Sequence, residues 1–142
     1  MNKNAIGPIC GISGVIISSS FIIISILLYP GYRLTEQALS ELGIARVSSV
    51  IFNSGLIISG ILFIPFFFSL RNFLGSTNIS NLGAALGSVT SISLVGIGIF
   101  PMTQPIAHLI PTTSFFVLGT ASIALIGKKL FSVSRICGVF SF

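Results

Sequence analysis

The chain has 142 residues, of which 53% are hydrophobic and only 6% are charged, and its formal net charge is +5. A soluble domain carries roughly 25% charged residues, so this composition excludes a water-soluble globule and predicts a protein embedded in lipid. The basic residues flank apolar runs, as they do in membrane proteins, which argues against nucleic acid as a partner. Two cysteines, one histidine and two acids are too few for a disulfide framework or a metal cluster, so we expect no metal and no cofactor.

Four apolar windows are long enough to cross the hydrocarbon core, which takes about 20 helical residues. Unpaired backbone groups are too costly in lipid, so each window is predicted to be a helix. The first window is longer than the apolar part of a signal peptide and lacks an A-x-A-like site, which predicts a retained helix. The four predicted spans are residues 8–29, 47–70, 82–100 and 106–127.

These spans predict an all-α fold: one polytopic transmembrane helix bundle that forms a single domain over residues 1–142. The segment after Lys129 is too short to span the membrane. We expect it to form a C-terminal stub, which is either an interfacial tail or the opening of a further helix.

The segment RLTEQALSELGIAR, residues 33–46, holds both carboxylates of the chain. Within it, Leu34, Ala38 and Leu42 recur every four residues, and the polar side chains fall mostly elsewhere. This pattern predicts a short amphipathic helix over residues 34–43 that lies in the membrane interface.

The distribution of basic residues predicts the orientation. Five basic residues fall on the side of the N-terminus and two on the side of segment 33–46, where both acids offset them. The positive-inside rule then places the N-terminus in the cytoplasm of a multi-pass cell-membrane protein, with segment 33–46 outside. The two groups are Lys3, Arg71, Lys128, Lys129 and Arg135 on the first side, and Arg33 and Arg46 on the second.

Small residues recur at helical spacing in the first and third spans. Lipid gives helices no hydrophobic reason to associate, so small residues that permit close approach gain importance. We predict that these faces are buried against one another; the functional alternative is that they line a conduit. The helix-packing candidates are Gly7, Gly11, Gly14, Ser18, Gly83, Gly87 and Ser91.

Four polar residues form a candidate site on the outer face: Glu36, Glu41, Asn53 and His108. One imidazole near two carboxylates could shuttle protons or hold a metal, although the chain has no H-x-x-x-H or H-E-x-x-H motif. The simpler interpretation is that His108 bonds a loop carbonyl and that Asn53 bonds backbone of the first or third span, because an amide in hydrocarbon needs a partner.

Several runs also occur in a distinctive order: YPGYRLTEQALSELG, IFNSGLIISGILF, SLRNFLG, LVGIGIFPM, AHL and FFVLG. Together, over roughly residues 8–130, they resemble the domain-of-unknown-function 998 family of multi-span membrane proteins from archaea and bacteria. LSELG gives a fainter resemblance to the Frag1/DRAM/Sfk1 group. The first resemblance implies a helical membrane bundle, commonly with more spans than the four predicted here. It also implies an acid near Glu41 and a histidine at His108 as common features, and it supplies no activity.

Three functions are compatible with these patterns. The first is a structural or accessory subunit of a larger membrane assembly, with the lipid bilayer and other membrane subunits as partners. The alternative is a protein of the outer leaflet that binds, carries or modifies a lipid or small molecule through the Glu/His/Asn cluster. An ion pathway ranks last, because the third and fourth spans offer only Ser and Thr at mid-membrane depth.

Overall fold

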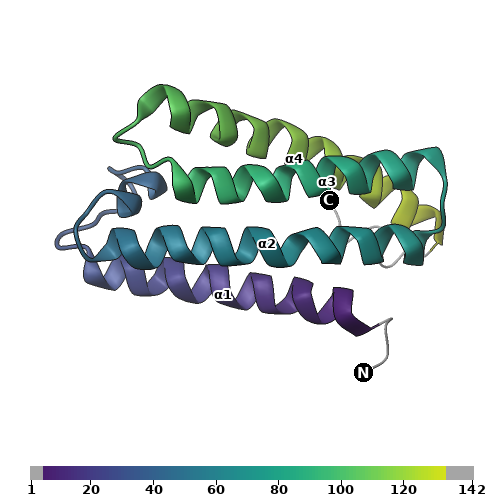
Figure 1. Ribbon diagram of the computed structural model, residues 1–142, viewed down its shortest axis with the longest axis horizontal. Helices are drawn as coiled ribbons and strands as arrows, with labels where there is room; N and C mark the ends of the chain where they lie inside the picture. Colours follow the sequence, from purple (N-terminus) through teal and green to yellow (C-terminus); the bar gives the residue numbers. More distant parts are fainter. Residues whose placement is uncertain (1–4, 134–142) are drawn as a thin grey trace.

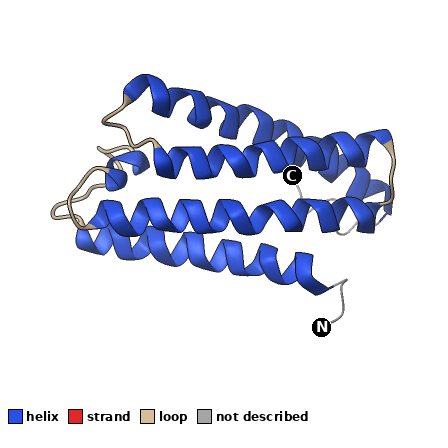
Figure 2. Cartoon of the chain, viewed as in Figure 1, coloured by secondary structure: helices blue, strands red, loops and turns tan. Residues whose placement is uncertain are grey.

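The computed structural model describes residues 5–133, which form four long helices and no strand (Figures 1 and 2). All four helices are long and apolar enough to cross a membrane. This confirms the prediction of an all-α, polytopic bundle. The elements are α1 (Ile6–Leu28), the short 3-10 helix η2 (Leu39–Gly43), α2 (Ser48–Leu74), α3 (Asn78–Ile99) and α4 (Pro105–Val133).

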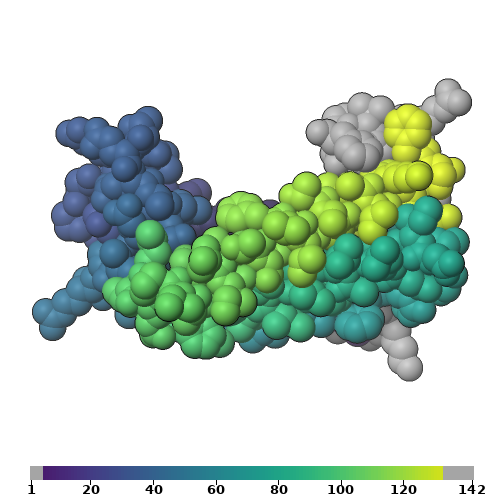
Figure 3. All heavy atoms as spheres, turned by 90° about the horizontal axis from the view of Figure 1, so that it is seen from above, coloured from purple at the N-terminus to yellow at the C-terminus, as the bar shows by residue number. Residues whose placement is uncertain are grey.

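The helices pack in chain order as an open row. The extensive contacts are α1 with α2, α2 with α3 and α3 with α4, and no comparable contact joins α1 to α4 within residues 5–133. Seen from above, the molecule is hollowed on one side, between the loop before α2 and the far end of α4 (Figure 3). The share of the spanning window that is buried is 50% in α3 but only 17% in α1 and 11% in α4. Each end helix therefore packs against one neighbour and leaves most of its surface uncovered by the rest of residues 5–133.

Glycines bring α2 and α3 into backbone contact at the centre of the row. A Cβ atom added at Gly60 would lie 2.7 Å from the carbonyl oxygen of Ser91, and one added at Gly98 would lie 2.7 Å from that of Asn53. Real Cβ atoms do not approach other atoms so closely, so only glycine permits this spacing. Gly60 was not among the predicted packing residues.

The predicted small-residue faces are mostly buried, but they do not face each other. The row places α2 between α1 and α3. The glycines of α1 and α3 therefore pack against side chains of neighbouring helices and not against each other. Gly7, Gly11 and Gly14 of α1 lie against Ser69, Phe66 and Phe63 of α2, Gly87 lies against Phe67, and Gly83 lies against Ile126 of α4. Ser91 is buried and donates to the Gly87 carbonyl at 2.8 Å. Ser18 is only partly buried and donates to Val15 in its own helix.

Three of the helix boundaries have a clear local cause. Gly75 ends α2 with φ at +79°, a backbone conformation that glycine adopts without strain. Thr77 then caps α3: its hydroxyl accepts from the Ser80 amide, and the Ser80 hydroxyl accepts from the Thr77 amide at 2.9 Å. Pro105 occupies the first position of α4, where its missing N–H costs nothing.

The structure separates the two charge groups to opposite ends of the bundle. Because the row alternates in direction, Arg71 near the end of α2 and the lysines near the end of α4 share one end, and η2 lies at the other (Figure 1). α4 continues through Val133, so the predicted stub begins inside this helix. Residues 134–142, which hold Arg135 and the rest of that stub, lie outside the described residues, as does Lys3.

The hydrophobic core lies at the η2 end. Leu42 of η2 is completely buried and packs with residues from α2 and α3. The buried cluster consists of Leu42, Phe52, Leu56, Leu94 and Ile97. The short helix therefore belongs to the core of the bundle and does not simply rest on a lipid surface.

Candidate functional site

Segment 33–46 folds into two turns and η2, so the helix expected over residues 34–43 is limited to Leu39–Gly43. Arg33 organises the first turn: its guanidinium pairs with Glu36 at 2.8 Å, and its amide donates to the Gln37 side chain at 2.9 Å. Ala38 is extended, with ψ at 144°, which interrupts any helix at that point. Local side-chain bonds thus outcompete the amphipathic pattern.

The two predicted acids have different surroundings. The Arg33–Glu36 pair is exposed at the surface, where such pairs contribute little to stability. Glu41 is partly buried, and each of its carboxylate oxygens accepts one bond. The Ala38 amide donates to Oε1 at 3.0 Å, and the Gln37 amide group donates to Oε2 at 3.2 Å. Glu41 therefore caps the N-terminal end of η2.

Asn53 ties η2 to α2. Its side-chain Nδ2 donates to the carbonyl oxygen of Gly43 at 3.2 Å. Gly43 is buried, and a Cβ atom there would lie 2.6 Å from the Asn53 Oδ1 atom. The amide therefore bonds backbone, but its partner lies in η2 and not in the first or third span, which the simpler interpretation of this residue expects.

His108 performs a similar task at the turn between α3 and α4. Its imidazole is buried, with 8% of the residue exposed, and its Nδ1 atom lies 2.6 Å from the carbonyl oxygen of Phe100. A histidine bonded to a loop carbonyl is the simpler of the two interpretations given by the sequence. The bond joins the first turns of α4 to the end of α3.

The four candidate residues do not form one bonded set. Within residues 5–133, no hydrogen bond or ion pair joins any two of Glu36, Glu41, Asn53 and His108. The described range 5–133 also contains no group of three or more His, Cys, Asp or Glu side chains that could hold a metal ion. In the described part of the chain, Glu41, Asn53 and His108 thus act as three separate local anchors at the η2 end.

Tyr32 is a further polar residue of this region, and it lies in the loop between α1 and η2. Its hydroxyl is buried and has no hydrogen-bond partner, and its ring meets that of Tyr29 edge to face with 5.5 Å between centroids. Burial raises the pKa of Tyr32, and the nearby Glu41 and Tyr29 raise it further. This hydroxyl therefore stays protonated above the usual range of tyrosine.

A cleft of about 290 Å³ lies beneath η2 on the hollowed side of the row. It is lined by η2 and all four long helices, and none of its lining residues is charged. Its polar groups are the hydroxyls of Ser18, Ser40 and Thr112, and the Thr112 Oγ1 atom is buried without a hydrogen-bond partner. The sequence could not reveal this cleft, because its walls come from five separate segments.

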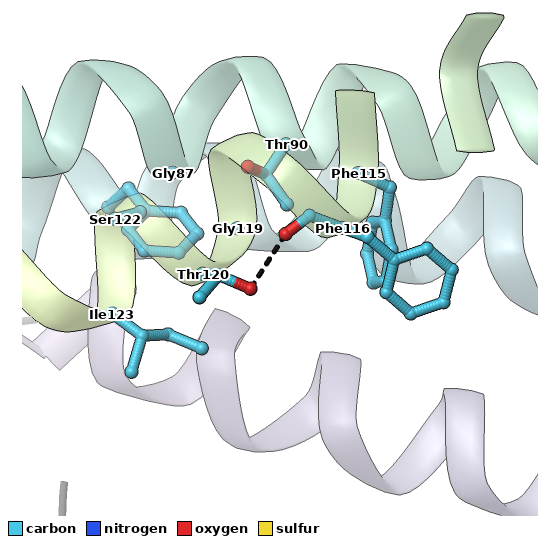
Figure 4. Close-up of a pocket in the computed structure, with 9 residues that line it drawn as sticks. Gly87, Thr90, Phe115, Phe116, Gly119, Thr120, Ser122 and Ile123 are labelled. Carbon is cyan, nitrogen blue, oxygen red and sulfur yellow. Dashed lines mark hydrogen bonds between the residues drawn. The ribbon is translucent and has the colours of Figure 1, made fainter. Parts of the chain in front are cut away.

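A second, smaller cleft of about 190 Å³ is lined by residues of α2, α3 and α4. Thr90 and Gly119 lie on facing helices there, and the Thr120 hydroxyl donates to the carbonyl oxygen of Phe116 at 2.7 Å (Figure 4). Phe115 and Phe116 line both clefts. The two aromatic residues therefore mark the lower limit of the larger cleft.

A family model described as a protein of unknown function, DUF998, matches residues 12–142. The chain belongs to the DUF998 family. The match spans most of the chain and confirms the resemblance carried by the ordered sequence runs. No curated protein and no solved structure matched this DUF998 chain. Together with its four apolar helices, the family match describes a small multi-pass membrane protein.

Proposed function

We propose that this DUF998 protein is an accessory subunit of a larger membrane assembly, which it contacts through the end helices of the row. The observation that carries the proposal is the open packing order. Each end helix packs extensively along a single neighbour, and the buried shares of 17% and 11% leave α1 and α4 free for helices of another chain. Helices in lipid associate through such close lateral contacts.

The polar residues support a structural role over a catalytic one. Glu41 and Asn53 hold η2 in place, and His108 holds the turn between α3 and α4. Each is already engaged in a bond that shapes the fold. This use of its polar side chains supports a role in which the protein acts through partners.

Site-specific photocrosslinking in native membranes tests the proposal. A photoreactive amino acid at Ile16 of α1 or Val117 of α4, which are 59% and 60% exposed, should yield an adduct with a second, different polypeptide. Ile92 of α3 is the matched control, because it is 58% exposed and lies on the best-buried helix. Equal adducts at all three positions, or no polypeptide adduct at either end helix, would contradict the proposal.

We further propose that the N-terminus lies in the cytoplasm of a cell-membrane protein. The basic residues Arg71, Lys128 and Lys129 lie at the end of the bundle opposite η2, and cytoplasmic ends carry the excess of Lys and Arg. A background with Cys10→Ser and Cys137→Ser allows single cysteines to be tested in intact cells. An impermeant maleimide should label Thr103→Cys and leave Ser76→Cys unlabelled; the opposite pattern would reverse the orientation.

A further inference from the structure

The cleft beneath η2 has dimensions that restrict what can occupy it. Its wall along α2 runs from Phe52 to Phe63, which corresponds to about 16 Å at the rise of an α-helix. This is about half of the 30 Å hydrocarbon core, and so about the depth of one leaflet. The cleft begins at Leu39 and Ser40, and it is lined at its deeper end by Phe63 and Phe116.

The volume is too small for a helix. A 16 Å length of α-helix about 10 Å across occupies on the order of 1,200 Å³, several times the cleft volume. Dividing about 290 Å³ by a depth of about 16 Å gives a mean cross-section on the order of 20 Å². One extended hydrocarbon chain has a cross-sectional area of this size.

The chemistry of the walls agrees with these dimensions. Apolar side chains dominate the lining, and no charged side chain contributes to it. The nearest acid along the chain, Glu41, is engaged with Gln37 and the Ala38 amide. Such a wall complements an uncharged tail and would reject a charged headgroup, which would lose its hydration without gaining a partner.

We infer that the cleft is a binding site for one hydrocarbon tail of a membrane phospholipid from the leaflet on the η2 side. The tail enters beside Leu39 and Ser40, passes Thr112, and ends against the phenylalanines at mid-membrane depth. The headgroup stays at the membrane surface beside η2. The inference is independent of the accessory role, because it requires no second polypeptide.

The test uses the full chain, purified in mild detergent and incubated with a phosphatidylcholine that carries a diazirine in the middle of one tail. After illumination, the labelled peptides are identified by mass spectrometry. The expected result is preferential labelling of α4 around residues 112–116. Labelling only of residues on the outer faces of the helices would overturn the inference.

Two neighbouring threonines provide a matched pair of variants. Thr112 lines the cleft, whereas Thr113 is exposed on the outside of the same helix. Thr112→Phe should reduce the labelling several-fold by filling the cleft, and Thr113→Phe should leave it unchanged. Ser18→Phe fills the cleft from the opposite wall and should cause the same loss, so it decides the matter if Thr112→Phe does not fold. Equal labelling of all folded variants would refute the site.

Discussion

The hydroxyl of Ser122 on α4 donates a hydrogen bond of 2.7 Å to the carbonyl oxygen of Gly83 on α3. Both residues are buried, and the bond joins two helices. Gly83 allows this approach, because a side chain there would press against Ile126 of α4. A small residue and a hydroxyl thus cooperate to attach α4 to the row, in a region where lipid offers no hydrophobic drive.

We predict that Ser122→Ala destabilises the protein by about 0.5–1.5 kcal/mol, the range of hydrogen bonds between membrane helices. The measurement is the free energy of unfolding in mixed micelles of mild detergent and dodecyl sulfate. Thr120→Ala is the control, because Thr120 is exposed and bonds only to Phe116 of its own helix. An equal loss in both variants would show that the interhelical bond contributes nothing specific.

Replacement of Gly60 by alanine should separate α2 from α3. The added methyl group would meet the backbone oxygen of Ser91, which cannot rotate away, so the helices must move apart. We expect a loss of about 1–3 kcal/mol in the free energy of unfolding, as for overpacked cores. Gly119→Ala should cost less, because its nearest neighbour is the methyl group of Thr90 at 3.2 Å. The reverse order would contradict the close approach at Gly60.

Asn53→Ala should release η2 from α2, since the side chain of Asn53 holds the Gly43 carbonyl. Local opening exposes backbone amides without global unfolding. Hydrogen–deuterium exchange of a peptide covering residues 39–44 should therefore accelerate. Ser54→Ala serves as the control, because Ser54 bonds only to Val50 of its own helix. Unchanged exchange in Asn53→Ala would mean that the other contacts of η2, among them the buried Leu42 and the Ser48 hydroxyl bond to its carbonyl, hold it without Asn53.

Stability should fall at alkaline pH because of Tyr32. Its pKa is raised above 10.0 in the folded protein, first by burial and then by Glu41 and Tyr29. Above pH 10 the unfolded chain therefore binds fewer protons than the folded one, and the free energy of unfolding decreases as pH rises through this range. Tyr32→Phe should abolish this part of the decrease. Spectroscopic titration should show the late ionisation of one tyrosine in the wild type, and this late step should be lost in Tyr32→Phe.

At neutral pH we expect Tyr32→Phe to have a different effect on stability. The Tyr32 hydroxyl is buried without a partner, so its removal should be neutral or stabilise the protein by up to about 1 kcal/mol. A clear loss of stability would show that this hydroxyl has a partner in the membrane.

The sequence predicted the spans because hydrocarbon selects for long apolar helices, whatever their neighbours. It also identified buried glycines such as Gly11 and Gly87, since small residues at helical spacing indicate a packed face. It could not tell which helix would receive them. That depends on the order of the row, which puts α2 between α1 and α3.

Local patterns failed where side chains compete with the backbone. The four-residue repeat of Leu34, Ala38 and Leu42 predicts one continuous helix, but the bonds of Arg33 and Gln37 form a turn there instead. Asn53 and His108 were found by their polarity. A bond to a loop carbonyl was among the alternatives for His108, whereas the partner of Asn53 lies in η2 and not in the first or third span. The cleft was missed, because Ser18, Ser40 and Thr112 become neighbours only after the helices have packed.

The packing of each helix against its predecessor has a consequence for biosynthesis. A nascent chain that leaves the insertion machinery can complete each hairpin as its second helix emerges, and later helices need not slot between earlier ones. Assembly can thus proceed vectorially during translation. The most recently synthesised helix would always lie at the edge of the row, where the next inserted helix can pack against it.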